Sequence, residues 1–332
     1  MRRYICLLVL VSFLRVFGQN DPIQITEPLP SASSLMTFAD IPVDTYTGVP
    51  SIGIPLFEMD TYSKDINLNL SLAYHPNNIS MLEKASDVGL GWSLFAGGSI
   101  SRTVVGCPDE YYNSTMGVNF IVNNFDDIYN YNVMGLTGRF KILRNTTNNT
   151  YSIQMLDESK TKIEFDMNLV TTQVNSFTIY DDRGYKYYFN QIDWNAANFW
   201  VKRIFDTVPN KPIILYISSH HLTTVTDPNG KVLLDFTYQL YTRELVPGNP
   251  IWDKKALKLS SIVSPGNGKV DFTYSVTSLL DSDASDPLQL NGITIKDVFN
   301  TTVKSFGFEY LMHSYMLGFS EKKRRFLTTV RE

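Results

Sequence analysis

The feature of this 332-residue sequence that most limits its fold is an alternation of apolar and polar residues with a period of two. In residues 68–74, leucine or tyrosine occupies every second position, with polar or small residues between. Residues 270–274 and 306–310 repeat this pattern with aromatic residues and one valine. A period of two puts alternate side chains on opposite faces of a strand, whereas an amphipathic helix needs apolar residues three or four positions apart. The sequence therefore predicts an all-β fold.

Near-copies of one segment predict a repeated β-hairpin. Residues 222–238 and 259–274 both read as a leucine, small polar residues, a turn and a strand that ends in Phe-Thr-Tyr. The turn of the first copy holds Asp227, Pro228 and Gly230; the corresponding residues of the second copy are Pro265 and Gly268. Proline presets φ at the first corner of a turn, and glycine accepts the positive φ that reverses the chain. Each copy is therefore predicted to form strand, turn, strand.

Two looser copies follow these. Residues 290–310 form a third copy and residues 327–330 begin a fourth, so the starting leucines lie 37, 31 and 37 residues apart. An earlier relative, residues 179–189, places Asp181 and Gly184 between aromatic strands. An isolated hairpin is only marginally stable in water. We therefore expect antiparallel β-hairpin repeats that pair side by side into one long curved sheet.

The fourth copy has a first strand and no second one. Residues 327–331 are therefore expected to form an unpaired sheet edge, and we expect the natural protein either to continue past Glu332 or to have been truncated.

The N-terminus has the three-part pattern of a secretory signal peptide. Arg2 and Arg3 precede an apolar run over residues 5–14, and the stretch ends in the small residue Gly18. The run is much shorter than the roughly 20 apolar residues that span a bilayer. We therefore expect a cleavable signal peptide over residues 1–18 and a mature chain that is secreted or held at the cell surface without a transmembrane segment. The remainder is predicted to divide into an N-terminal β region, residues 19–115, and a degenerate hairpin-repeat region, residues 116–332.

Charge and cysteine content exclude further classes of function. Removing the three arginines of the leader takes the formal net charge from −4 to −7. No basic face remains to bind phosphates, so nucleic-acid binding is not expected. The basic run of residues 322–325 is predicted to decorate a solvated turn. Cys6 leaves with the leader, and Cys107 is interpreted as a small buried hydrophobe without a disulfide partner.

Motifs in the N-terminal half resemble a known family. They are Ala32-Ser33-Ser34-Leu35, residues 41–56, the run Gly89-Leu90-Gly91-Trp92-Ser93 and the run Gly97-Gly98-Ser99-Ile100-Ser101-Arg102. In this order and spacing they are similar to the N-terminal region of the secreted Rhs or YD-repeat proteins typical of Bacteroidetes. Gly89, Gly91, Trp92, Gly97, Gly98 and Arg102 are the structural signature of this resemblance. Independently of it, glycines beside a large aromatic residue predict close backbone approach around a tryptophan packed in the core.

The resemblance implies a β-sheet strip that spirals into a hollow shell around a C-terminal effector. The implied partners are the missing C-terminal repeats and effector of the full-length chain, together with a target-cell surface. The sequence departs from the family pattern, because we find no highly repetitive core, self-cleavage segment, effector or sorting domain. Toxicity and self-cleavage are therefore not assigned to these residues.

No group of residues has the spacing of a catalytic, metal or cofactor site. The histidines lie at positions 75, 220, 221 and 313, and His220 and His221 would point to opposite sides of a strand. The glycines of residues 89–98 lack the Lys-Ser/Thr pair and the helix of a phosphate loop. No Gly-x-Ser-x-Gly elbow is present. The stretch of residues 123–127, which ends in two aspartates, is interpreted as a solvated turn in preference to a calcium loop. We therefore predict a protein that is not an enzyme and holds no metal or cofactor.

Two functional hypotheses of different class remain. The first is a non-catalytic structural segment of an exported repeat protein, either a polymorphic-toxin-like shell or a cell-surface protein. The second is a secreted carbohydrate- or protein-binding β module, in which Trp194, Trp200 and Trp252 stack on sugars. A shell buries its aromatic residues between sheets, whereas a lectin-like module displays them in a shallow groove.

Overall fold

The computed structural model describes residues 52–76, 79, 83–105, 108–111, 127–145, 147–198, 213–243, 254–276, 285–317 and 320–332. The expected leader over residues 1–18, Cys107, Trp200 and Trp252 lie outside these ranges. Of residues 123–127, the structure describes only Asp127.

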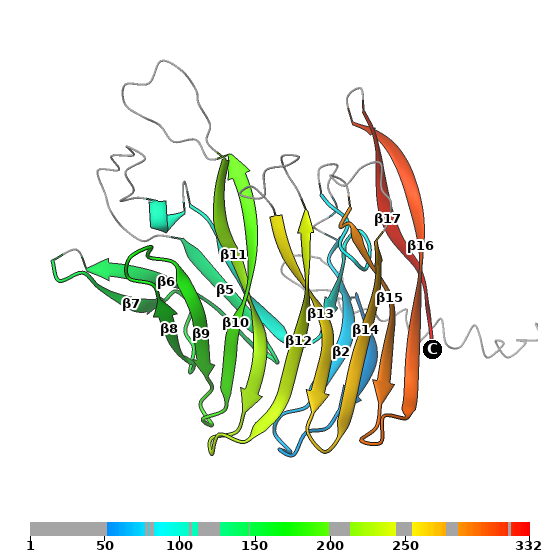
Figure 1. Cartoon of the computed structure of the whole chain (residues 1–332), viewed down its shortest axis with the longest axis horizontal. Helices are drawn as coiled ribbons and strands as arrows, with labels where there is room; N and C mark the ends of the chain where they lie inside the picture. The colour runs from blue at the N-terminus through cyan, green and yellow to red at the C-terminus, as the bar shows by residue number, and fades with distance from the viewer. Residues whose placement is uncertain are drawn as a thin grey trace, which may run out of the picture. The chain divides into compact units, whose positions relative to one another are not determined.

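Strands account for nearly all regular structure of the described residues (Figure 1). The early strands are β1 (Ile52–Met59), β2 (Leu68–Tyr74), β3 (Trp92–Phe95), β4 (Gly98–Thr103), β5 (Ile128–Val133), β6 (Leu136–Asn145), β7 (Thr150–Met155), β8 (Lys162–Met167) and β9 (Val174–Tyr180). The later strands are β10 (Lys186–Asn198), β11 (Ile213–Thr226), β12 (Val232–Arg243), β13 (Lys254–Ser264), β14 (Gly268–Val276), β15 (Leu288–Lys296), β16 (Thr302–Leu317) and β17 (Ser320–Arg331). One 3-10 turn, η2, covers Asp109–Tyr111. In the part of the chain that the structure describes, no helix is long and apolar enough to cross a membrane.

The strands form one sheet of 14 strands and one of three. The main path of the large sheet runs β17-β16-β15-β14-β13-β10-β11-β4-β5-β6-β7; β12 also pairs with β11 and β13, and β9 joins β8 to β10. The small sheet has the order β1-β2-β3. Every pairing between these named strands is antiparallel, so the predicted all-β fold with antiparallel sheets is confirmed.

The predicted copies form consecutive hairpins in the large sheet. The first copy is the β11–β12 hairpin, the second is β13–β14 and the third is β15–β16. The start of the fourth copy lies in β17, which pairs along β16 from Leu317↔Ser320 to Gly307↔Arg331. β17 is the last strand on the path of this sheet, so among the described strands residues 327–331 lie at an edge.

Aspartate closes three of the hairpin turns in the same way. The carbonyls of Asp181, Asp227 and Asp297 each accept the amide of the residue three positions later, at 3.0–3.1 Å. Their Oδ1 atoms accept the amides two and four positions later, at 2.8–3.0 Å. The third position after each aspartate has positive φ and is Gly184, Gly230 or Asn300. The aspartate carboxylate therefore accepts hydrogen bonds from backbone amides of the turn, which have no partner on a neighbouring strand, as in an Asx turn.

The turn of the second copy is built without aspartate. The carbonyl of Ser264 accepts the amide of Asn267 at 3.0 Å. Pro265 lies at the first corner of this turn, and Gly266 and Gly268 have positive φ. In the first copy, Pro228 has the matching place directly after Asp227.

The small sheet packs on the large one through its alternating leucines. Leu68, Leu70 and Leu72 are at most 2% exposed and belong to the same hydrophobic cluster as Phe236 and Ile293 of the large sheet. Burial of one such leucine stabilises the fold by about 1.5–3 kcal/mol. The apolar face of the hairpins is thus covered by an earlier part of the chain.

The loop between β1 and β2 contacts the hairpin turns. Ser264 Oγ donates to the Asp60 carbonyl at 3.1 Å. Lys231 Nζ lies 3.5 Å from the ring centre of Tyr62, and a 2.6 Å hydrogen bond joins the hydroxyls of Ser63 and Tyr185. The small sheet is therefore fixed at this end to three successive turns.

Candidate functional site

The two strands of each hairpin copy pair only near their turn. β11 pairs with β12 over Thr224–Thr226, β13 with β14 over Ser261–Ser264, and β15 with β16 over Gly292–Lys296. Upstream of these residues the first strand separates from its hairpin partner. Backbone groups on that side need other partners, because a buried unsatisfied amide or carbonyl costs about 1–3 kcal/mol. Many of these partners come from residues 85–103, which we name the linking segment.

The linking segment contacts the first strand of three copies through backbone hydrogen bonds. Its strand β4 pairs with residues 219–221 of β11. The Asp87 carbonyl accepts the amide of Leu290 at 3.0 Å, and the Leu90 amide donates to the Arg325 carbonyl at 2.8 Å. All these contacts lie at the starting leucine of a copy or within three residues before it. The linking segment therefore fills the gaps where the hairpins separate.

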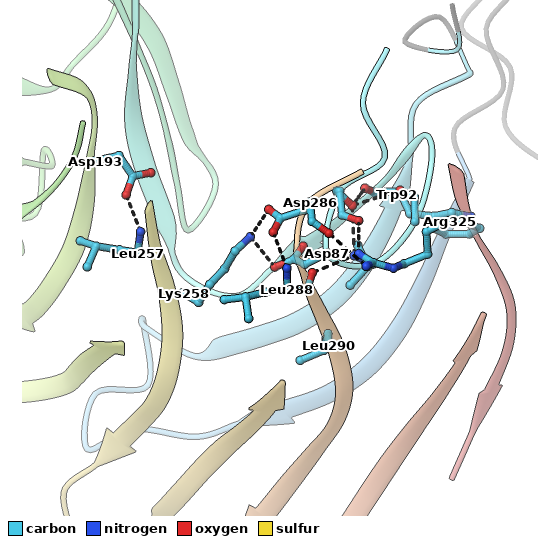
Figure 2. A network of polar contacts seen from close by, with 12 residues as sticks. Asp87, Trp92, Asp193, Leu257, Lys258, Asp286, Leu288, Leu290 and Arg325 are labelled. Atoms are coloured by element: carbon cyan, nitrogen blue, oxygen red, sulfur yellow. Dashed lines mark hydrogen bonds and ion pairs between the residues drawn. The ribbon is translucent and has the colours of Figure 1, made fainter. Parts of the chain in front are cut away.

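In the second copy, side chains make this connection. The Leu257 amide donates to Asp193 Oδ1 at 2.6 Å. The Lys258 ammonium group bonds the carboxylates of Asp87 at 3.0 Å and Asp286 at 2.6 Å (Figure 2). Burial alone would lower the pKa of Lys258, but the two carboxylates outweigh it and raise that pKa above its ordinary value. Lys258 therefore stays charged and joins β13 to the linking segment and to the residues before β15.

Arg325 forms the other half of this network, on β17. Its side chain is fully buried and donates to three carbonyls, those of Ser86 at 3.1 Å and of Asp286 and Leu288 at 3.0 Å each (Figure 2). Burial lowers its pKa from the ordinary value of 12.5, and the charge of Asp286 opposes that change. Ser285 Oγ bonds the Lys323 carbonyl and the Arg325 amide, each at 3.2 Å. The outer side of β17 is thus partly covered upstream of Leu327.

The expectation for the basic run of residues 322–325 was wrong. These residues lie inside β17, and Arg324 and Arg325 are 7% and 0% exposed. The sequence prediction failed because the carbonyls that Arg325 binds come from two distant segments, so no local pattern marks its burial.

The two glycines of the Gly-Leu-Gly-Trp run allow this close approach. Gly89 has a φ of 107°, and a Cβ atom there would lie 2.8 Å from the Leu327 amide nitrogen. Any side chain would therefore push the linking segment away from β17. Gly91 also has positive φ and lies against the Tyr74 ring. Trp92 is half-buried, 5.0 Å from Tyr74 between ring centres, and its carbonyl accepts Ser86 Oγ at 2.7 Å.

The second glycine pair lies where the linking segment enters the large sheet. A Cβ atom on Gly97 would lie 2.6 Å from the ring of Phe236, and one on Gly98 would lie 2.4 Å from the Asn132 carbonyl oxygen. Both glycines have positive φ.

Arg102, the last signature residue, is the centre of a buried ion cluster. It bonds Glu110 at 2.5 Å and Asp127 at 2.6 Å, and the three side chains are at most 5% exposed. Asp127 also accepts the Val105 amide at 2.8 Å. Burial raises the pKa of Asp127, and Arg102 opposes that rise. Asp127 is 0% exposed, so the solvated-turn interpretation is wrong for this residue of the acidic stretch.

His220 and His221 contact different surroundings. His220 is buried, bonds the Val174 carbonyl at 3.0 Å and lies against Phe177. Burial lowers its pKa to about 4. His221 Nε2 bonds Asp193 Oδ2 at 2.9 Å. His75 lies 3.1 Å from Ser93 Oγ, and His313 contacts the ring of Phe326.

The structure describes part of the sugar-binding surface that the second hypothesis invokes. Trp194 is half-buried in β10, and the other two tryptophans of the proposed sugar-binding surface lie outside the described ranges. Within those ranges no group of three or more His, Cys, Asp or Glu residues is arranged to hold a metal ion.

The sequence interpretation missed Lys258, Asp286, Asp193 and Arg325. One signal was present: His221, Lys258 and Arg325 are basic residues within two positions before a starting leucine. Aligning the copies on those leucines would have singled them out.

Comparison with known proteins gives matches among solved structures. The N-terminal domain of effector protein SpvB from Salmonella typhimurium strain LT2 is 12% identical, with 84% of this chain and 98% of that one covered and a TM-score of 0.44. TcdB2-TccC3 is 11% identical over 88% of this chain with a TM-score of 0.48, and TcdB2-TccC3-Cdc42 is 10% identical over 85% with a TM-score of 0.45. The matched region spans only 16% and 15% of those two chains. No family model matches the sequence, and no curated protein matches it.

Proposed function

We propose that this chain is an exported, non-catalytic structural segment of an Rhs/YD-repeat protein, serving as part of a polymorphic-toxin-like shell or of a cell-surface protein. The observation that carries the proposal is the linking segment, which contacts all four hairpin copies at the place where each copy begins. The same segment thereby fixes the first strands of successive hairpins relative to one another. The resemblance of the same residues to the N-terminal region of the family supports the proposal.

Pairing of the charged groups at the site supports a structural role. Lys258 bonds two carboxylates, His221 bonds Asp193, and Arg102 bonds Glu110 and Asp127. A catalytic acid or base needs to exchange a proton with a substrate, whereas these groups are held by one another.

The outer edge of β17 supports continuation of the sheet. Leu327–Glu332 aligns with Leu222–Asp227 of the first copy. In the first copy the second strand begins pairing two residues after the starting leucine, at Thr224. In β17 the linking segment covers the edge at Arg325, upstream of the corresponding position. The part of the edge that corresponds to the paired residues of the first copy thus begins at Thr329, beyond the residues that the linking segment contacts.

An extended chain tests this proposal. A copy of residues 228–241 is appended after Glu332, where it supplies the turn and second strand that the first copy has. We expect the melting temperature to rise by several degrees, because a few kcal/mol of new pairing shifts it by roughly 1–2 °C per kcal/mol in a chain of this length. The control carries the same appended residues in scrambled order. Equal melting temperatures for the two extended chains would argue against the proposal.

Export is tested separately by the N-terminus of the chain recovered outside the cell. We expect it to begin at Gln19 or Asn20, after cleavage near Gly18. Recovery of an uncleaved chain in the cytoplasm alone would contradict export.

A further inference from the structure

The second hairpin copy differs from the first and third at one tyrosine. Tyr238 and Tyr310, each at the end of its copy, donate their hydroxyls to the carbonyls of the starting leucines Leu222 and Leu290, at 2.6 and 2.7 Å. Tyr274 has the corresponding place in the second copy. Among the described residues its hydroxyl makes no hydrogen bond, although its ring packs against the core. The Tyr274 hydroxyl is not among the fully buried polar atoms, so water or a ligand can reach it.

Tyr274 lines a pocket of about 320 Å³. It is lined by residues of the linking segment and of the strands of the first two copies, and β13 pairs with β14 only over Ser261–Ser264. Its walls include the tyrosines at positions 238 and 274, His221, Ser99 and Asn132. This volume is at the lower end of the range for small-molecule sites, about 300–1,000 Å³.

The charges at the pocket disfavour an anion. Lys258 lines it and is outnumbered by its two partners, Asp87 and Asp286. His221 lines it and is held by Asp193. Lys258 contributes +1, and the three aspartates contribute −3, so with His221 counted as neutral the formal net charge of these groups is −2. A negatively charged ligand would therefore be repelled at short range.

The remaining groups suit a ligand with several hydroxyls. Tyr274 offers a hydroxyl that both donates and accepts, and serine and asparagine side chains add further donors and acceptors. The rings of His221 and Tyr238, with centres 5.2 Å apart, form an aromatic wall. Aromatic faces and mixed hydrogen-bonding groups together match the apolar and polar sides of a sugar ring.

We propose that this pocket binds a neutral polyhydroxylated molecule of monosaccharide size, with the Tyr274 hydroxyl as a direct hydrogen-bond partner. The inference stands independently of the structural role proposed above, since a scaffold segment with or without further repeats would contain the same pocket.

Binding of free sugars to the full chain tests the inference. Glucose, galactose, mannose, N-acetylglucosamine and myo-inositol are each titrated by ligand-observed NMR and calorimetry. We expect at least one to bind and its dissociation constant to rise about tenfold in Tyr274→Phe, which removes one hydroxyl and keeps the ring. Tyr310→Phe is the matched control, because it removes the equivalent hydroxyl of the third copy outside the pocket, and it should bind as the unchanged chain does.

Three outcomes would overturn the inference. The first is that none of the five compounds binds at millimolar concentration. The second is that Tyr274→Phe binds as tightly as the unchanged chain while circular dichroism shows both to be folded. The third is that glucuronate binds more tightly than glucose, which would contradict the exclusion of anions.

Discussion

Two ion clusters in this molecule differ in how far apart in the sequence their residues lie and in how deeply they are buried. The Arg102 cluster joins residues 8 and 25 positions apart, and its side chains are at most 5% exposed. The Lys258 network joins Lys258 to Asp87, 171 positions away, with side chains 14% to 25% exposed. The Arg102 cluster fixes the start of β5 next to β4, whereas the Lys258 network fixes an early segment to late hairpins. Deep burial makes a pair costly to break, and partial exposure lets water and salt compensate.

Breaking the Arg102 cluster is expected to have the largest effect. Arg102→Met leaves Glu110 and Asp127 buried without their cation, so we expect the free energy of unfolding to fall by about 3–5 kcal/mol. Urea denaturation followed by circular dichroism measures this. Arg139→Met is the matched control, because its partner Asp157 is on the surface, and we expect a change of less than about 1 kcal/mol. Similar losses for the two variants would contradict the comparison.

Acid is expected to weaken the fold near the Arg102 cluster through His220. Its pKa is about 4 in the folded chain and 6.5 ordinarily, so above pH 6.5 the histidine is neutral in both states and contributes nothing. Between pH 6.5 and 4 the unfolded chain takes up a proton that the folded chain does not. Stability should therefore fall across this window by about 3 kcal/mol, at 1.36 kcal/mol per pKa unit.

The pH dependence is measured by urea denaturation at pH 7, 5.5 and 4. The charged groups that influence His220 are Arg102, His221 and Asp193. His220→Leu should remove most of the loss between pH 6.5 and 4, while His75→Gln, at an exposed histidine, should not. A His220→Leu chain that loses as much stability as the unchanged one would refute the role of His220.

The smallest effect is expected from the Lys258 network. Lys258→Met leaves two partly exposed carboxylates without their cation, and we expect a loss of about 1–2 kcal/mol, between the values for exposed and for fully buried pairs. Because partly exposed charges are screened, this loss should shrink in 1 M salt, while the loss from Arg102→Met should stay nearly constant. Urea denaturation of both variants at low and high salt measures how each loss in the free energy of unfolding depends on salt. Equal salt dependence would show that burial does not distinguish the clusters.

The sequence was sufficient for the features that depend on neighbouring residues. Alternation in residues 68–74 predicted a strand with one buried face, and β2 has Leu68, Leu70 and Leu72 inside. The repeated segments predicted hairpins, and the structure pairs them as β11–β12 and β13–β14. These features follow from strand geometry and from turn residues whose side chains bond their own backbone.

The candidate site could not be derived in this way. Arg325 was expected on a solvated turn and is fully buried, because the carbonyls it binds belong to Ser86, Asp286 and Leu288. Its charge alone predicts exposure, since arginine is rarely buried without partners. These partners surround Arg325 only because the linking segment lies against β15 and β17 in the folded chain.

The sequence by itself determined the strands, the hairpin turns and the apolar face of each hairpin, since these depend on contacts within a few residues. Tertiary structure alone decided what covers those faces and where the hairpins separate. Residues 85–103 reach copies that begin at Leu222, Leu259, Leu290 and Leu327. The physical reason is that periodicity specifies the direction of a side chain, while its partner is set by how the whole chain packs.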